Sequence, residues 1–147
     1  MNKPRSLRAA LSAGVPYLKA NPEALHVYID KGRVVSTGFP AQGWEYRYTL
    51  NLVITDYSGD QNILMAAILN WLMVNQPDSL ANDELRERLF SFEADIIRND
   101  LADIAIFLEL TERVLVSVNG GVATVTAIPE PGNPEEQDNY WLSHGKP

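Results

Sequence analysis

One stretch in the first half of the chain alternates between large apolar and polar side chains over most of its length. It begins at position 44 and reads WEYRYTLNLVITDY. Because successive side chains of a strand point to opposite faces, this pattern predicts a β-strand with one buried and one solvent-facing side. The buried side takes Trp44, Tyr46, Tyr48, Leu50, Leu52 and Ile54, and the solvent-facing side takes Glu45, Arg47, Thr49, Asn51 and Thr55.

Later segments carry the same two-residue period and predict further strands. Residues 89–98 form one of them, and residues 103–118 repeat the pattern over a greater length. A turn at 119–121, with two glycines, leads into a last strand at 122–128. In residues 89–98 the positions expected to face the core are Phe90, Phe92, Ala94 and Ile96.

The N-terminal part predicts a helix followed by a small β-unit. Ser6 is a candidate N-cap for a short helix over residues 7–13. Residues 25–30 and 33–37 are rich in β-branched side chains and flank Lys31 and Gly32, which favours a hairpin.

A helix is predicted from Gln61 to about Gln76, with Asp60 as its N-cap and Pro77 as its end. Between positions 63 and 74 only Asn70 is polar, so this helix must be covered on more than one side. Two explanations remain open: the helix is sandwiched within its own domain, or a neighbouring copy of the chain covers one flank. Together these elements predict an α+β fold, an antiparallel-rich sheet with helices packed on one face.

The chain is expected to form a single α+β domain over residues 1–128, followed by a disordered acidic tail at 129–147. A length of 147 residues suits one domain. The last segment contains four prolines and four acidic residues, and no apolar periodicity. Its single apolar cluster is Tyr140, Trp141 and Leu142, which is either a docking motif or a segment that folds back onto the domain.

Composition narrows the possible classes of protein. The chain has no cysteine, which excludes disulfides and thiolate metal sites. The net charge of −7 disfavours the binding of phosphate groups, so no specific nucleic-acid binding is expected, although the first twenty residues are basic. We expect no secretory signal, because the basic first segment lacks an uninterrupted apolar run. We also expect no membrane span, because the apolar run at 63–74 is too short to cross a bilayer.

Candidate catalytic and metal-binding groups are few. His26 and His144 have no evident partners, and the acidic turn after position 55 lacks the glutamate that a calcium loop needs at its twelfth position, where Ala67 stands. Glu93 and Asp95 share a predicted strand face and lie near further acids, so they are the one candidate carboxylate site. We therefore expect no catalytic residue, no metal ligand and no cofactor, and keep a small acidic enzyme or an adaptor protein using Glu93 and Asp95 as the alternative.

Several blocks of the chain resemble one known family. The blocks NKPRSLRAAL, VPYLKANPE, WEYRYTLNLVITDYSGD, NWLMVNQPD and FEADIIRNDLADIAIFLELTERV occur in order between Asn2 and about Val118. They are similar to the tail completion protein R (GpR) family of Peduovirus-type contractile-tailed phages. The hairpin after Asn119 and the C-terminal tail lie outside this resemblance.

The resemblance implies a structural virion protein and no enzymatic activity. Such a protein, with a fold like that of a phage tail terminator, completes the head-proximal end of the tail and prepares it for head-tail joining. The implied partners are other copies of itself in a ring, a hexamer, together with tail tube, sheath and head-neck proteins. The implied location is the virion tail, reached from the host cytoplasm during assembly.

The hypothesis for the interface residues combines both lines of reasoning. A protein that meets its own copies and two different neighbours needs contact surfaces rather than a catalytic pocket. The candidate interface residues are Glu45, Arg47, Thr49 and Asn51 on the solvent-facing side of the strand, and Tyr140, Trp141 and Leu142 in the tail.

Overall fold

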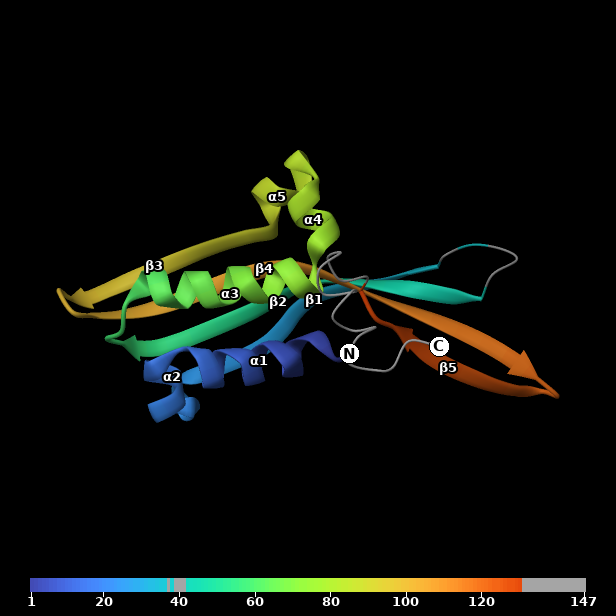
Figure 1. Cartoon of the computed structure of the whole chain (residues 1–147), viewed down its shortest axis with the longest axis horizontal. Helices are drawn as coiled ribbons and strands as arrows, with labels where there is room; N and C mark the ends of the chain where they lie inside the picture. Colours follow the sequence, from blue (N-terminus) through green and yellow to red (C-terminus); the bar gives the residue numbers. More distant parts are fainter. Residues whose placement is uncertain (37, 39–41, 131–147) are drawn as a thin grey trace, which may run out of the picture.

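The sheet is built around one long strand, β4 (Leu101–Asn119), which forms hydrogen-bonded ladders with β2, β3 and β5. This computed structural model describes residues 1–36, 38 and 42–130. The other strands within that part of the chain are β1 (Leu25–Ser36), β2 (Gly43–Tyr57), β3 (Phe90–Arg98) and β5 (Val122–Ile128). All ladders are antiparallel, in the order β1-β2-β4-β3, and β5 also pairs with β4 (Figure 1). The predicted α+β class is confirmed.

The predicted two-sided character of β2 is confirmed at its centre. Leu50, Leu52 and Ile54 are fully buried on one face. Leu50 lies opposite Leu108, and Leu52 lies opposite Ile106 in the neighbouring strand β4. Cross-strand pairs of this kind bury apolar surface directly against each other, and each fully buried leucine contributes about 1.5–3 kcal/mol.

Helices cover this apolar face of the sheet. α1 (Lys3–Gly14) and α3 (Gln61–Asn75) lie side by side along it, and α2 (Pro16–Ala20) and the short 3₁₀ turn Pro22–Ala24 complete the layer (Figure 1). The remaining helices, α4 (Pro77–Ala81) and α5 (Asp83–Leu89), connect α3 to β3. We call the face covered by α1 and α3 the helical face and the opposite one the open face.

The helix α3 begins where the sequence predicts, because the Asp60 carboxylate accepts a hydrogen bond from the Asn62 amide at 2.8 Å. Its buried side presents Leu64, Ile68 and Leu72 to the sheet. On the outer side, Leu69 and Met73 are exposed to solvent. The idea that α3 is sandwiched within its own domain is therefore wrong, since one flank of this apolar helix is uncovered in the isolated chain.

The start of α1 differs from the prediction. The helix begins at Lys3, so Ser6 lies inside it rather than at its N-cap. The Ser6 hydroxyl instead accepts a hydrogen bond from the indole nitrogen of Trp71 at 3.0 Å. A serine inside a helix can keep such a lateral contact, and here the contact fixes α1 against α3.

The predicted hairpin at Lys31 and Gly32 is wrong. Both residues lie within one continuous strand, β1, and Gly32 is opposite Tyr48 in β2. The irregularity that the sequence suggested is a β-bulge between Ile29 and Lys31, which leaves Asp30 without a direct cross-strand partner. An extra residue of this kind bends a strand but does not reverse it.

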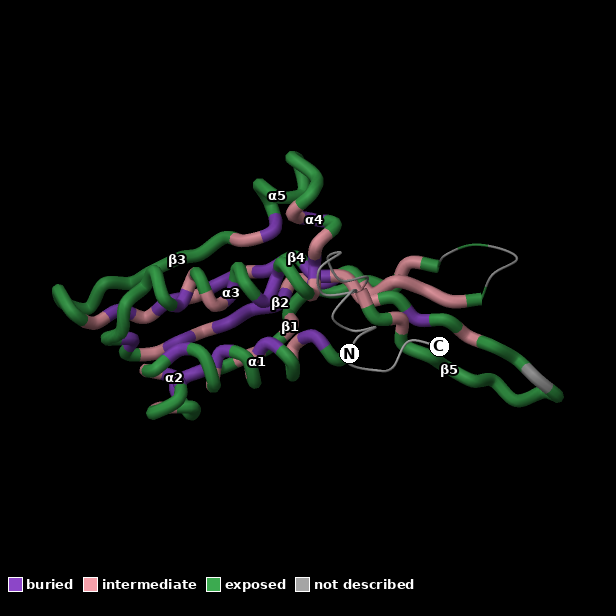
Figure 2. Tube along the Cα trace, in the orientation of Figure 1, coloured by how far each residue is buried: buried purple, intermediate pink, exposed green. Residues whose placement is uncertain are grey.

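Strand β3 has the predicted extent but not the predicted burial. Phe92 is 58% exposed and Ile96 is 71% exposed, although both are on the helical face, opposite Ile106 and Ala102. Figure 2 shows exposure along nearly the whole strand. The helices lie over β2 and β4 and do not extend over this edge of the sheet. The apolar side chains of β3 on the helical face therefore have no layer that covers them.

Strands β3 and β5 occupy the same edge of β4 but do not meet. β3 pairs with β4 as far as Leu108, and β5 pairs with it from Arg113 onward. β2 takes the other edge of β4 up to Leu115. Residues 109–112 of β4 therefore have no strand partner on the β3 edge among the described residues, and side chains must satisfy their backbone groups there.

The predicted tail at 129–147 is described only for Pro129 and Glu130. The cluster Tyr140, Trp141 and Leu142 lies outside the described residues. In the part of the chain that the structure describes, no helix has the length and apolar character that crossing a membrane requires.

Candidate functional site

The predicted polar row on β2 forms one wall of a groove on the open face. The groove has a volume of about 870 Å³. Glu45, Arg47 and Thr49 line it from β2, and Arg88 and Leu89 line it from α5. The residues that give the groove its mixed charge are Lys31, Arg33, Glu45, Arg47, Asp78, Arg88 and Glu109.

Glu45 and Arg47 form an ion pair on this wall. The Nε atom of Arg47 donates to the Glu45 carboxylate at 2.6 Å, and the Arg47 side chain is 46% exposed. Residues two apart on a strand share a face, which explains why the sequence brings these charges together. An exposed pair of this kind contributes little to stability, about 0–1 kcal/mol.

Thr49 and Asn51 differ from each other in their surroundings. The Thr49 hydroxyl donates to the Glu109 carboxylate of β4 at 2.8 Å at the surface. Asn51, by contrast, is only 2% exposed, and its amide donates to the Asp30 carboxylate at 2.8 Å. The expectation that Asn51 is solvent-facing is wrong, because the bulge at Asp30 and the flanking strands enclose its side chain.

The two carboxylates of the candidate site, Glu93 and Asp95, stand at the surface of the sheet. Both lie exposed on β3, and Asp95 is opposite Asp103 in β4. Asp103 accepts a hydrogen bond from the Asp56 amide at 2.9 Å and so has a structural role. Within the described residues no group of three potential metal ligands occurs. His26 is exposed on β1, and His144 lies outside the described residues.

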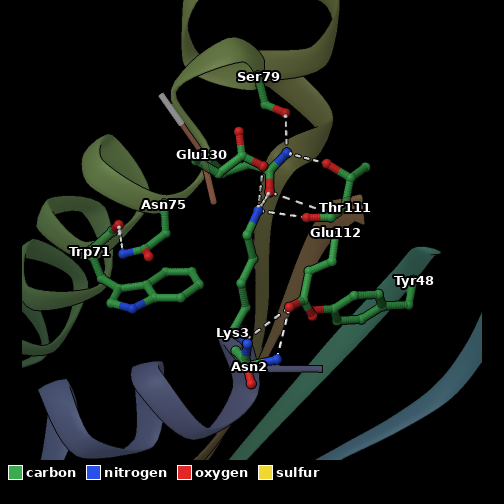
Figure 3. Close-up of polar contacts among 10 residues, drawn as sticks. Asn2, Lys3, Tyr48, Trp71, Asn75, Ser79, Thr111, Glu112 and Glu130 are labelled. Carbon is green, nitrogen blue, oxygen red and sulfur yellow. Dashed lines mark hydrogen bonds and ion pairs between the residues drawn. The ribbon is translucent and has the colours of Figure 1, made fainter. Parts of the chain in front are cut away.

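A polar cluster that the sequence did not reveal lies in the gap between β3 and β5. The Nζ atom of Lys3 donates to Gln76 Oε1 at 2.7 Å, to the Thr111 carbonyl at 2.5 Å and to Glu130 Oε1 at 2.8 Å (Figure 3). Gln76 in turn accepts from the Thr111 amide at 3.2 Å and donates to the Thr111 hydroxyl at 2.9 Å. Side chains thus replace the missing strand partner of Thr111.

A second set of contacts in this cluster fixes the start of α1. Glu112 Oε1 accepts from the amides of Asn2, at 2.8 Å, and Lys3, at 3.3 Å. A carboxylate at a helix N-terminus satisfies free amides and complements the helix dipole. Glu112 Oε2 accepts from the Tyr48 hydroxyl at 2.7 Å. Burial and this carboxylate together raise the pKa of Tyr48 well above its ordinary value of 10.0.

The sequence offers little that would identify this cluster in advance. Lys3 is separated from Gln76 by 73 positions and from Glu130 by 127. One local indication points to Gln76. This polar residue follows an apolar helix and precedes Pro77, so its side chain must find a partner outside the helix. Tertiary structure alone brings these residues together.

Comparison with known proteins agrees with the resemblance noted from the sequence. The model of the family described as P2 phage tail completion protein R (GpR) matches residues 1–131. Among curated proteins, the chain is 45% identical over 135 residues to "Tail completion protein R" of Escherichia phage P2, an alignment that covers 92% of this chain and 87% of that protein. No solved structure matches the chain.

These matches define a structural protein of phage tails, not an enzyme. The chain belongs to the P2 phage tail completion protein R (GpR) family. As a member of that family it is a component of the virion tail and interacts with other tail components.

Proposed function

We propose that this chain forms a ring, a hexamer, that finishes the head-proximal end of a contractile phage tail and prepares it for joining to the head. The family match over residues 1–131 is the observation that carries this proposal. Contractile tails have sixfold symmetry, and head-to-tail contacts between identical subunits form a closed ring when the rotation between neighbours closes. The partners are the tail tube and sheath on one side and head-neck proteins on the other. Assembly takes place in the host cytoplasm.

Within this function, the groove on the open face is a contact surface for a neighbouring protein. Its charges of both signs suit a partner with a complementary set, which gives orientation and specificity more than affinity. Arg47 is the central residue, because its guanidinium offers five donors and only Nε is engaged by Glu45 among the described contacts. Glu45 and Thr49 act beside it, whereas the enclosed Asn51 is hydrogen-bonded to Asp30 and does not reach the partner.

The same proposal assigns roles to the two parts of the chain. Residues 1–128 act as one folded domain, and the acidic tail at 129–147 carries a second contact, made by Tyr140, Trp141 and Leu142. An aromatic cluster in an otherwise polar segment is typical of a short docking motif. No cofactor, membrane or specific nucleic acid takes part.

The test is in vitro complementation of tails that lack this protein. Wild-type subunits should convert such tails into tails that join filled heads. The Arg47→Glu variant should fold normally, since Arg47 lies at the surface, but should complement poorly because it places like charges against each other in a contact from which water is excluded. Glu87→Lys on α5 is the matched control, a charge reversal at an exposed position outside the groove.

Circular dichroism distinguishes loss of contact from loss of fold. A folded Arg47→Glu subunit that complements as well as wild type would remove the groove from the proposal. Failure of the wild-type protein to complete tails would refute the function itself.

A further inference from the structure

The two outer strands of the described β1-β2-β4-β3 order are open along one edge. Among the described residues β1 pairs with β2 and β3 pairs with β4, so each has an outer row of backbone groups without a strand partner. Every step across the order is antiparallel, so β1 and β3 run in opposite directions. A second copy placed beside the first, with its helices on the same side, therefore brings its β1 antiparallel to β3. Such edges are ready templates for pairing with another chain.

The two edges carry opposite charge on the same face of the sheet. On β1, Lys31 lies opposite Thr49 and Arg33 lies opposite Arg47, which places both cations on the open face. On β3, Glu93 and Asp95 are on that face as well, opposite Ala105 and Asp103. All four side chains belong to exposed residues. Like edges thus repel each other and unlike edges attract.

Each edge also contains a like-charge contact within its own subunit. Arg33 faces Arg47 across the β1-β2 ladder, and Asp95 faces Asp103 across the β3-β4 ladder. Like charges directly opposite each other destabilise a sheet. Within the described residues no ion pair involves Arg33 or Asp95. A neighbouring strand of opposite charge would relieve both contacts.

On the helical face, the β3 edge and the β1 edge each carry an exposed apolar side chain. Phe92 of β3 is 58% exposed and Val34 of β1 is 63% exposed, and both are on that face. If Glu93 lies opposite Arg33 of the next copy, antiparallel pairing places Asp95 opposite Lys31 and Phe92 opposite Val34. A single register therefore pairs both acids with both cations and covers the uncovered phenylalanine. The α1 helix of the next copy, which packs on its own β1, then extends the helical layer toward β3.

We propose that copies of this chain associate through a continuous antiparallel sheet in which β3 of one subunit pairs with β1 of the next. The contact is heterologous, since each subunit presents β3 to one neighbour and β1 to the other, and contacts of this kind generate a closed ring when the rotation between neighbours closes. This inference rests on the proposed ring and states how its subunits meet. It also provides a cover for the exposed apolar side of β3.

Charge reversal at each edge tests the pairing in the tail-completion assay. Glu93→Lys with Asp95→Lys makes both edges basic, and Lys31→Glu with Arg33→Glu makes both edges acidic. Each double variant alone should complement at least about tenfold less well than wild type, because like-charge contacts at an interface are strongly unfavourable. Glu84→Lys with Glu87→Lys on α5 is the control and should complement as wild type does.

Two combinations should restore completion. The fourfold variant has both edges reversed, so its β3 again meets a β1 of opposite charge. An equal mixture of the two double variants should also complement, since the subunits alternate around a ring with an even number of members. Restoration by the mixture also shows that the double variants are folded.

Several outcomes decide the matter. Wild-type activity of both double variants would overturn the pairing while leaving the role in tail completion intact. Because Lys31 and Arg33 also line the groove, association of the fourfold variant's subunits is followed separately by sedimentation. Failure of that variant to restore association would overturn the pairing, whereas restored association without completion would support the pairing and place the loss in the groove. Rescue by the fourfold variant but not by the mixture would support the pairing and contradict a six-membered ring. Inactive wild-type protein would instead refute the proposed function.

Discussion

The side chain of Gln76 forms two hydrogen bonds with Thr111 in the place that a neighbouring strand would occupy. Its Oε1 atom accepts from the Thr111 backbone amide at 3.2 Å, and its Nε2 atom donates to the Thr111 hydroxyl at 2.9 Å. The contact lies where β3 has ended and β5 has not begun. One glutamine at the end of α3 thus closes a break in the edge of the sheet and joins the helical layer to β4.

Gln76→Ala should lower the free energy of unfolding by about 1–3 kcal/mol, because it leaves the Thr111 amide and the Lys3 ammonium short of partners in a buried place. Gln61→Ala at the exposed start of α3 is the control and should change stability by less than about 0.5 kcal/mol. Urea denaturation measures both. Equal small effects would show that water replaces the amide without cost.

Leu52→Ala should destabilise the protein by about 2–5 kcal/mol, because Leu52 is fully buried opposite Ile106 in the centre of the sheet. Thr49→Ala, three positions away on the open face, removes one surface hydrogen bond to Glu109 and should cost far less. Denaturant melts of the two variants provide the comparison. A similar loss at both positions would contradict the assignment of the two faces of β2.

Stability should fall in alkaline solution, partly through Tyr48. The pKa of Tyr48 is raised in the folded state, so its contribution is fully present below about pH 10, the pKa of an unfolded tyrosine. Above that pH the unfolded chain releases the phenolic proton first, and the free energy of unfolding should decline by up to about 1.4 kcal/mol per pH unit for this residue.

Tyr48→Phe should reduce this alkaline slope, whereas Tyr28→Phe at a half-exposed position of β1 should leave it unchanged. Unfolding free energies measured between pH 9 and 11 test the difference; these pH values lie around the ordinary tyrosine pKa of about 10. An identical slope in wild type and Tyr48→Phe would show that other tyrosines dominate.

Deletion of residues 131–147 should leave the melting temperature nearly unchanged, because the composition of that segment predicts few fixed backbone groups. Glu130→Gln should lower it, because the buried ammonium of Lys3 loses a charged partner at 2.8 Å. Differential scanning calorimetry separates the two effects. A large drop on deletion would make Trp141 a core residue and end its role as a docking motif.

Local sequence patterns predicted strands, helix starts and turns well where neighbouring residues alone determine the backbone conformation. Alternation located β2 and β4, Asp60 marked the start of α3, and the glycines at 120 and 121 marked a turn in which both have positive φ angles. The hairpin at Gly32 failed because a bulge and a turn produce similar local sequence, and the position of the partner strand β2 decides between them.

Burial was less predictable than secondary structure. The enclosed Asn51 and the exposed Phe92 both contradict the alternation, because burial depends on which neighbours cover a strand and not on its own period. The groove and the cluster around Lys3 join residues far apart in the sequence, so no local signal locates them.

The length of β4 has a mechanical consequence. Nineteen residues of strand extend for about 60 Å, and β2 runs beside most of this length. Because hydrogen bonds in an antiparallel pair lie perpendicular to the strands, a pull along β4 loads the whole β2-β4 ladder in shear, with all of its bonds sharing the force. A pull that peels β5 away from the hairpin tip would instead break its bonds one after another. The subunit is thus strongest against tension along β4, and single-molecule pulling along the two directions should give a higher rupture force for the first.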